Sequence, residues 1–327
     1  MTSAMPANLT PAYHKAEEAF RQAKTVTEKI AALEEMYATI PKHKGTEKMQ
    51  ADIRRRMAKL REAGEPGKAH AGVDRFHVDK HGAGQFVLIG TPNAGKSALV
   101  GALTKAHVNV APYPFATHGP VPGMMPYEDI QIQLVDLPPV TAEGMPPGMA
   151  GTVRAADGIL LCADLAAPDL LDQVDVCLKV LEGRGVVPAG REPPEAGQAM
   201  RMILVGTKVD LPGAAENFEA LKGLYANLPM VAVSSQTLQG MGEIPRLCFR
   251  LLGIVRVYSK EPGKPPDMKL PFILPQGSTV LDMAAAVHRD IAQNLKRARI
   301  WGANTYQGQA VNRDHVLADR DVIELHV

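Results

Sequence analysis

The segment from Gln85 to Ser97, QFVLIGTPNAGKS, constrains the fold more than any other part of the chain. Phe86–Ile89 is apolar, as in a buried strand, and residues 90–97 match the phosphate-loop pattern G-x-x-x-x-G-K-[ST]. Glycines in such a loop let backbone N–H groups surround a polyphosphate. The helix that follows directs its positive dipole end at the same anion. The segment therefore predicts a strand, an anion-binding loop and a helix within an α/β fold.

The polar side chains of this loop have distinct expected roles. Lys96 would reach the β- and γ-phosphates of a nucleotide, and the Ser97 hydroxyl would hold Mg²⁺. The expected phosphate-binding residues share this one loop and the first turn of its helix, and they are Asn93, Ala94, Gly95, Lys96, Ser97 and Ala98.

Two further residues are candidates for contact with the metal ion. Ile130–Asp136 (IQIQLVD) reads as a strand whose terminal Asp136 would face Mg²⁺ through a water. Thr117 lies between the phosphate loop and this strand, and it would reach Mg²⁺ when a γ-phosphate is bound. Taken singly, Asp136 is also explained as a strand-end turn residue, and Thr117 as an ordinary loop hydroxyl. Their order along the chain favours the metal site.

The base-recognition residues would follow the next two strands. Thr207 and Lys208 precede Asp210, whose carboxylate would accept two parallel hydrogen bonds from guanine. Adenine lacks that pair of donors, so Asp210 speaks against an ATPase, which stays an alternative. Ser234 and Ser235 would close over the guanine oxygen with backbone N–H groups. Each short motif alone also occurs by chance, but together they predict guanine specificity.

Alternation of apolar strands and helical segments predicts a mostly parallel sheet covered on both faces. Ligands of such sheets bind at the carboxyl ends of the strands, where these motifs lie. The expected strands are Phe86–Ile89, Ile130–Val135, Ile159–Ala163, Met202–Val205 and Met230–Val233, and the expected helices are 96–105, 169–182, 214–226 and 241–252. The segment 111–125 is rich in Pro and Gly and predicts a mobile loop around Thr117.

The residues before the linker at 65–84 predict a helical hairpin. Apolar residues three or four apart indicate one helix over 11–38 and a second over 46–62. Between residues 42 and 61 there are eight Lys or Arg against two acids, a local charge of +6. The sequence alone favours a solvated helix face on a packed hairpin, and a contact with the phosphate backbone of RNA is the alternative.

The last part of the chain, from residue 254, predicts a small β-grasp domain. Strands are expected at 255–258, 272–274, 299–301 and 322–326, with one helix over 280–295. Lys296, Arg297 and Arg299 lie beside Trp301, the only tryptophan. A solvated helix end beside a packed indole explains this cluster, and a face that docks RNA or protein is the alternative.

Composition excludes several classes of protein. No apolar run approaches the ~18 residues of a membrane span. The amino terminus has no charged region followed by an apolar core, so it does not read as a signal peptide. Three scattered cysteines have no metal-binding spacing and are interpreted as buried thiols of a cytoplasmic protein.

The combination resembles the Obg/DRG group of GTPases, and within it the DRG branch. The resemblance rests on residues 90–97, 111–123, 136–140 and 207–210, and on a carboxyl-terminal segment similar to a TGS domain. It implies three parts: a helical hairpin over 1–70, a P-loop GTPase domain over 71–253, and a TGS-like β-grasp domain over 254–327. It also implies GTP and GDP as ligands, Mg²⁺ as cofactor, and the ribosome, its RNA or another translation component as partner. A protein partner of the TGS-like domain is a further implication.

Departures from the usual GTPase pattern bear on mechanism. Val140 stands where many GTPases place a water-orienting Gln. Related GTPases with an apolar residue there often use K⁺, held partly by an Asn at the position of Asn93; an Asn in a tight loop also bonds its own backbone. Pro139 replaces a glycine and has no N–H for the γ-phosphate. Lys96, Thr117 and, through K⁺, Asn93 are therefore the expected catalytic residues of a slow GTPase.

The alternative function is a non-hydrolysing adaptor in which bound guanine nucleotide is structural, and Pro139 favours it. Eukaryotic DRG proteins also carry an extra domain between the Mg²⁺ acid and the base-recognition motif. The stretch between Asp136 and Lys208 is too short for a packed insert, so Gly183–Gln198 is expected to be a surface loop.

Overall fold

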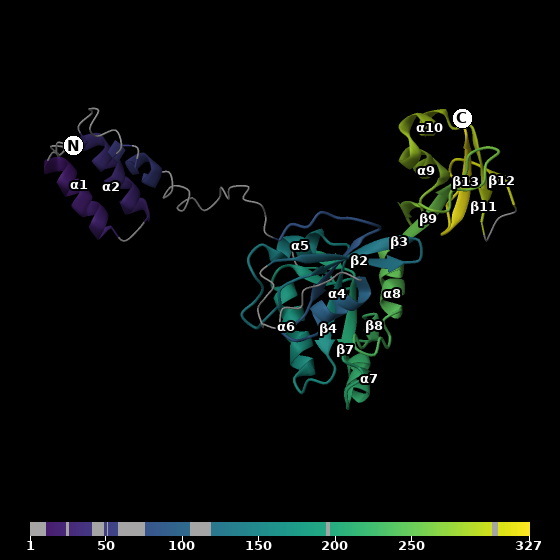
Figure 1. Ribbon diagram of the computed structural model, residues 1–327, viewed down its shortest axis with the longest axis horizontal. Helices are drawn as coiled ribbons and strands as arrows, with labels where there is room; N and C mark the ends of the chain where they lie inside the picture. Colours follow the sequence, from purple (N-terminus) through teal and green to yellow (C-terminus); the bar gives the residue numbers. More distant parts are fainter. Residues whose placement is uncertain are drawn as a thin grey trace, which may run out of the picture. The chain divides into compact units, whose positions relative to one another are not determined.

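The computed structural model describes residues 11–23, 26–40, 49–50, 52–57, 76–104, 119–193, 197–302 and 307–327. The chain divides into two compact units, Met1–Val73 and Asp74–Val327 (Figure 1). In the first unit, α1 (Pro11–Gln22) and α2 (Val26–Thr39) lie side by side. Tyr13 and Ala16 of α1 pack with Leu33 and Met36 of α2.

The prediction of one helix over 11–38 is wrong, because α1 ends at Gln22 and α2 begins at Val26. The β-branched residues Thr25, Val26 and Thr27 lower helix propensity around the point where α2 begins. Of the second expected helix, 46–62, the described residues 49–50 and 52–57 are helical, and Ile53 joins the core of α1 and α2.

The second unit contains a six-stranded sheet. Its neighbouring strands are parallel except for β2, which runs antiparallel to β3. The order across the sheet is β2 (Val121–Tyr127), β3 (Ile130–Asp136), β1 (Gln85–Ile89), β4 (Gly158–Asp164), β7 (Met202–Thr207) and β8 (Met230–Ala232). The predicted mostly parallel sheet is confirmed.

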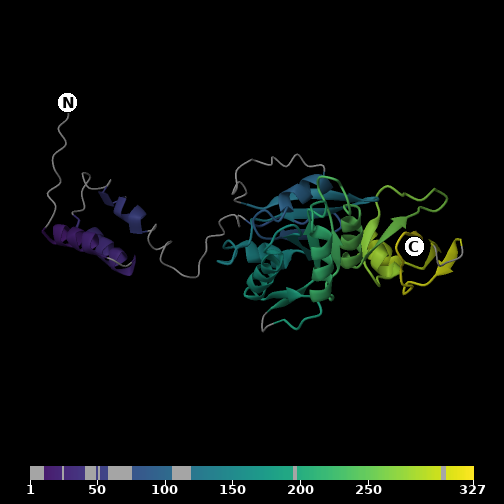
Figure 2. The same cartoon turned by 90° about the horizontal axis from the view of Figure 1, so that it is seen from below.

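Alternating residues of the central strands enter two cores, one on each face of the sheet. Phe86 and Leu88 of β1 pack under α4 (Lys96–Thr104) and α8 (Glu243–Leu252), whereas Val87 and Ile89 point to the other face. That face is covered by α5 (Met149–Ala155), α6 (Leu170–Glu182) and α7 (Ala214–Leu224), so helices lie on both sides (Figure 2). Burial on both faces explains why these strands are continuously apolar.

Two predicted loops are partly strands. Residues 121–125, expected to be mobile, belong to the edge strand β2, which pairs with β3 along its whole length. The expected surface loop 183–198 contains β5 (Val186–Pro188), which pairs in parallel with β6 (Gln198–Met200). Both predictions relied on Pro and Gly as loop signals.

A five-stranded sheet follows in the same unit. Its order is β10 (Phe272–Pro275), β9 (Ile254–Ser259), β13 (Asp321–His326), β11 (Arg297–Trp301) and β12 (Gln309–Val311). The central pair β9–β13 is parallel and the other pairs are antiparallel. This is the β-grasp arrangement that the order of elements predicts.

The prediction of a single helix over 280–295 is wrong. The segment forms two helices, α9 (Val280–Val287) and α10 (Arg289–Asn294), because His288 is extended with φ −166° and ψ 143°. Thr279 and Asp282 form a capping box that starts α9. The basic cluster is likewise not a helix end, because Arg297 and Arg299 are exposed residues of β11.

The cysteines Cys162, Cys177 and Cys248 are all unpaired and buried. Burial raises the pKa of the Cys162 thiol to about 12 and that of Cys177 to about 11. They are therefore packing residues rather than reactive thiols. Among the described residues, no helix is long and apolar enough to cross a membrane.

Candidate functional site

The phosphate loop joins the carboxyl end of β1 to the first residue of α4. A side chain at Gly90 would place its Cβ 2.7 Å from the Cys162 carbonyl oxygen, so the loop can lie against β4 only with glycine there. Gly95 has φ +82°, which favours glycine, and a Cβ there would lie 3.2 Å from the Thr207 side chain. Asn93 is exposed with φ 62°, a left-handed conformation that Asn tolerates. Sequence and backbone therefore agree on a tight loop.

The side chain of Lys96 lies inside this loop. Its Nζ donates to the carbonyl oxygens of Gly90 at 2.9 Å and Thr91 at 3.1 Å, and the residue is 7% exposed. Burial lowers the pKa of Lys96 below its usual value. Among the described residues, both hydrogen-bond acceptors of this ammonium are neutral carbonyls, so its charge can neutralise a bound anion.

Ser97 and Asp136 meet at the ends of α4 and β3. The Ser97 hydroxyl donates to Oδ2 of Asp136 at 2.5 Å, and Asp136 is 2% exposed. Burial raises the pKa of Asp136, although the Ser97 hydrogen bond and the Lys96 charge oppose it. Oδ1 of Asp136 is buried without a hydrogen-bond partner among the described residues. A hydroxyl beside a carboxylate with an unpartnered oxygen fits Mg²⁺, which prefers oxygen ligands. Thr117, the other expected metal contact, lies outside the described residues.

The loop after β7 contacts the phosphate loop directly. The Thr207 hydroxyl lies 3.0 Å from the Ala94 carbonyl oxygen and 3.1 Å from that of Ala163. Lys208 has φ 59°, and its Nζ lies 2.5 Å from Oδ2 of Asp164. Asp210 is exposed in the turn that follows. Thr207 therefore joins the phosphate loop to the sheet, while Asp210 stays available to a ligand.

Sequence reasoning missed Asp164. It ends β4 in register with Thr207, and its side chain is 13% exposed beside the ammonium of Lys208. Its Oδ1 also accepts from the backbone N–H of Ala166 at 3.0 Å. An acid at the carboxyl end of the strand between β1 and β7 was the available signal.

The loop after β8 is joined to the loop after β7. The Val209 N–H donates to the Val233 carbonyl oxygen at 3.1 Å. Ser234 is buried, and its hydroxyl accepts from the N–H groups of Gln236 and Thr237 at 3.2 and 3.1 Å. Ser234 thus shapes its own turn, and Ser235 beside it is half-buried.

The segment after Asp136 contacts the phosphate loop through its backbone. The Val140 N–H donates to the Gly90 carbonyl oxygen at 3.0 Å, and the Val140 side chain is fully buried. Neither group is free to orient a water molecule, and Pro139 has no N–H to offer. The Thr91 hydroxyl nearby is buried without a partner among the described residues.

The structure therefore brings most of the predicted residues to one edge of the sheet. Lys96, Ser97 and Asp136, the residues expected to bind phosphate and metal, lie at one end of this edge, with Ala98 exposed on the first turn of α4. The loops after β7 and β8 lie at the other end of this edge, because β7 and β8 are neighbours in the sheet.

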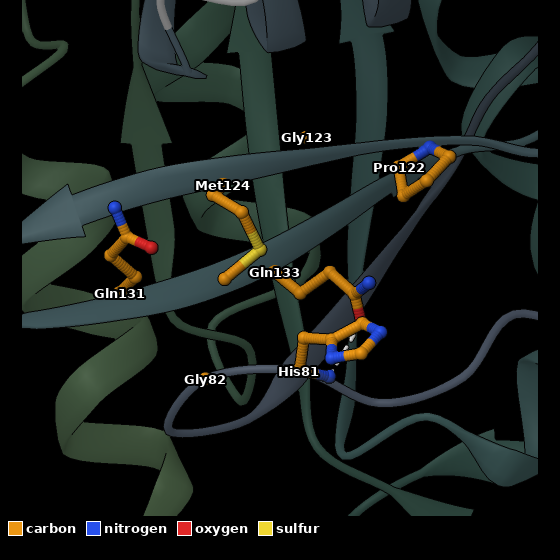
Figure 3. A pocket seen from close by; sticks show the side chains of 7 residues that line it. All are labelled: His81, Gly82, Pro122, Gly123, Met124, Gln131 and Gln133. Atoms are coloured by element: carbon orange, nitrogen blue, oxygen red, sulfur yellow. Dashed lines mark hydrogen bonds between the residues drawn. The ribbon is translucent and has the colours of Figure 1, made fainter.

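A separate hollow of about 470 Å³ lies along β2 and β3, lined by residues 81–82, 122–124, Gln131 and Gln133 (Figure 3). The backbone N–H of His81 donates to Oε1 of Gln133 at 3.2 Å, and Gln85 donates to the same oxygen at 2.8 Å. Of the predicted nucleotide-binding residues that the structure describes, none lines this hollow.

Comparison with known proteins agrees with this geometry. Residues 85–188 match the family described as 50S ribosome-binding GTPase, and residues 255–327 match the TGS domain. An uncharacterized GTP-binding protein of Methanocaldococcus jannaschii is 27% identical over 92% of both chains. Developmentally-regulated G-protein 1 of Arabidopsis thaliana is 28% identical over 92% of this chain and 91% of its own.

Developmentally-regulated GTP-binding protein 1 of Xenopus laevis is 26% identical over 91% of this chain and 98% of its own. Among solved structures, NFeoB of S. thermophilus is similar with a TM-score of 0.39 at 19% identity, over 51% of this chain and 61% of that one. The chain therefore combines a P-loop GTPase domain with a carboxyl-terminal TGS domain and is a relative of the developmentally regulated GTP-binding proteins.

Proposed function

We propose that this protein is a cytoplasmic, slow, K⁺-stimulated GTPase switch that binds GTP and GDP with Mg²⁺ and acts on the ribosome or another translation component. The observation that carries the proposal is the cluster of Lys96, Ser97 and Asp136, with a buried, unpartnered carboxylate oxygen beside a hydroxyl. It is the arrangement that a magnesium-bound polyphosphate needs. The proposed domains are 1–70, 71–253 and 254–327.

Each predicted residue has a role in this proposal. Lys96 neutralises the β- and γ-phosphates, and backbone N–H groups of residues 93–98 hold their oxygens. Ser97, Asp136 and, with GTP, Thr117 orient the metal ion, which supplies positive charge at the phosphates. Asp210 and the backbone at Ser234 and Ser235 select guanine. Thr207 holds the loop after β7 against the phosphate loop, and Lys208 holds it against Asp164.

Calorimetry with purified protein tests the proposal. GDP and a non-hydrolysable GTP analogue should bind with Mg²⁺, and ATP should not compete at equal concentration. Binding of neither guanine nucleotide at millimolar concentration would remove the proposed function. Preference for ATP would remove the role of Asp210 alone.

Replacing Asn93 by Gly tests the proposed K⁺ site. Glycine preserves the left-handed backbone at φ 62° and removes only the side-chain amide. Single-turnover GTP hydrolysis by the wild-type protein should be faster in K⁺ than in Na⁺, by about 10-fold if K⁺ supplies ~1.4 kcal/mol of transition-state stabilisation. The variant should lose this difference and keep its GDP affinity. A K⁺ effect that persists in the variant would mean that the Asn93 side chain does not hold the ion and serves only the conformation of the loop.

Replacing Arg55 by Glu tests ribosome contact by the first unit. Arg54 donates to the Tyr37 hydroxyl at 2.8 Å and Arg56 pairs with Asp52 at 2.8 Å, so changing either would also disturb the helices. Arg55 is exposed between them. Its reversal should weaken co-sedimentation with ribosomes by about 3- to 10-fold at low salt, and progressively less as salt rises. Lys15→Glu, which makes the same charge change at an exposed position of α1, is the matched control and should keep wild-type sedimentation. Unchanged sedimentation of the Arg55 variant would contradict this contact.

The second candidate function is the non-hydrolysing adaptor. It is favoured by Pro139 and by the engagement of the Val140 N–H with Gly90. Nucleotide binding without turnover above background, in either alkali ion and with or without ribosomes, would establish it over the GTPase.

A further inference from the structure

The turn between β2 and β3 is held by the carboxyl-terminal sheet. Arg256 of β9 is 2% exposed, and its Nη1 lies 2.5 Å from a carboxylate oxygen of Glu128 and 2.6 Å from one of Asp129. Its Nη2 donates to Asp319 at 2.7 Å within its own domain. The Tyr258 hydroxyl donates to Asp129 as well. We call Arg256, Tyr258, Glu128, Asp129 and Asp319 the Arg256 clamp.

The charges of the clamp depend on one another. The hydrogen bond from Arg256 lowers the pKa of Glu128, and burial together with the hydrogen bond to Asp129 raises the pKa of Tyr258 to about 12. A second arginine, Arg320, donates to Glu128 at 2.7 Å. Removal of Arg256 would take away the cation that Asp129 of the GTPase domain and Asp319 of the carboxyl-terminal domain share. This loss should be costly because Arg256 itself is almost fully buried.

The guanidinium also lies against aromatic rings of the GTPase domain. It is 4.8 Å from the ring centroid of Phe249 on α8 and 5.8 Å from that of Tyr127, the last residue of β2. These two rings are 5.1 Å apart. The clamp therefore holds the end of β2, the turn and α8 together.

The clamped hairpin leads to the metal end of the nucleotide site. β2 and β3 pair residue by residue from Tyr127 with Ile130, next to the turn, to Val121 with Asp136 at the open end. One end of the hairpin is therefore fixed by Arg256, and the other carries the carboxylate beside Ser97. A continuously paired hairpin of this length spans roughly 20 Å at ~3.3 Å per residue, so it connects the clamped turn directly to Asp136.

We propose that Arg256 is a positioning residue for the nucleotide site: by fixing the β2–β3 turn to the carboxyl-terminal domain, it couples the docking of that domain to the position of Asp136. This inference rests on the proposed function. Coupling is reciprocal, so bound nucleotide would also alter how firmly the domain is held. The domain that carries β9 thereby becomes the element that responds to the nucleotide state.

Arg256→Met in the full-length chain tests the coupling, because methionine keeps an unbranched apolar side chain and removes the charge. Arg297→Met, an exposed arginine on β11 of the same sheet, is the matched control. Two quantities are measured: the radius of gyration by small-angle X-ray scattering, and the ratio of affinities for a Mg²⁺-bound GTP analogue and for GDP.

We expect Arg256→Met to increase the radius of gyration and to change the affinity ratio at least threefold, with Arg256→Lys intermediate and Arg297→Met unchanged. A role confined to stability would leave the ratio unchanged. If the Met variant does not fold, Asp129→Asn carries the same test from the GTPase side. An unchanged ratio in a variant whose domain has undocked overturns the coupling, as does an unchanged radius of gyration. Absence of nucleotide binding by the wild-type protein would instead overturn the proposed function, and this inference with it.

Discussion

Asp210→Asn is expected to weaken GDP binding by about 100-fold, because two charge-assisted hydrogen bonds to guanine become weaker or repulsive, at a cost of ~3 kcal/mol. The amide would present N–H toward a guanine group that is itself a donor. Xanthine carries an acceptor at that place, so the variant should bind xanthosine diphosphate more tightly than GDP. Calorimetry with both nucleotides measures this reversal.

The reversal separates base recognition from damage to the fold. Asp210 is exposed, so the melting temperature without nucleotide should stay at the wild-type value. Glu216→Gln, an exposed carboxylate at the start of α7, serves as the control and should keep wild-type specificity. Unaltered GDP affinity of Asp210→Asn would refute the assignment of this carboxylate to guanine.

The fold could be predicted from the sequence wherever burial dictates the residue pattern. The central strands are apolar because both of their faces are covered, and the sequence predicted each of them to within a few residues. Strand β2 was missed because Pro122, Gly123 and Pro126 are loop signals. Proline is tolerated there, since β2 is the edge strand of the described sheet and pairs with β3 on one side. The interruption between α9 and α10 at His288 could not be predicted, because no proline or glycine marks it in the sequence.

The candidate site divides in the same way. Motif spacing predicted Lys96, Ser97 and Asp136 as members of one site, because each motif directly follows a strand of a parallel sheet. Asp164 has no motif of its own, and only the folded chain reveals its contact with Lys208. The Arg256 clamp joins residues more than a hundred positions apart, and nothing local to either segment indicates the other.

Asp136→Asn is expected to have opposite effects on the protein with and without nucleotide. Burial raises the pKa of Asp136, so its ionised form is less favourable in the folded chain than in the unfolded one. The stability linked to this group is present below its unfolded pKa and is lost as pH rises through the higher folded pKa. At neutral pH a neutral amide should therefore raise the melting temperature without nucleotide, by about 2–4 °C per kcal/mol relieved.

With nucleotide the same substitution should be harmful, because Mg²⁺ requires the ionised carboxylate. The variant should lose the increase in melting temperature that Mg²⁺ and the GTP analogue give the wild-type protein, an increase that grows with ligand concentration over Kd. Thermal unfolding with Mg²⁺ or a chelator measures both effects, and Glu143→Gln, an exposed nearby carboxylate, is the control.

Acidification supplies an internal check on Asp136→Asn, since the wild-type side chain becomes neutral as well. The advantage of the variant without nucleotide should therefore shrink as pH falls through the raised pKa of Asp136. A lower melting temperature of the variant at neutral pH would mean that the carboxylate stabilises the fold itself. A retained Mg²⁺-dependent increase would mean that the metal is held elsewhere. A higher melting temperature without nucleotide, together with loss of the Mg²⁺-dependent increase, is expected only if the ionised Asp136 destabilises the fold and binds the metal ion.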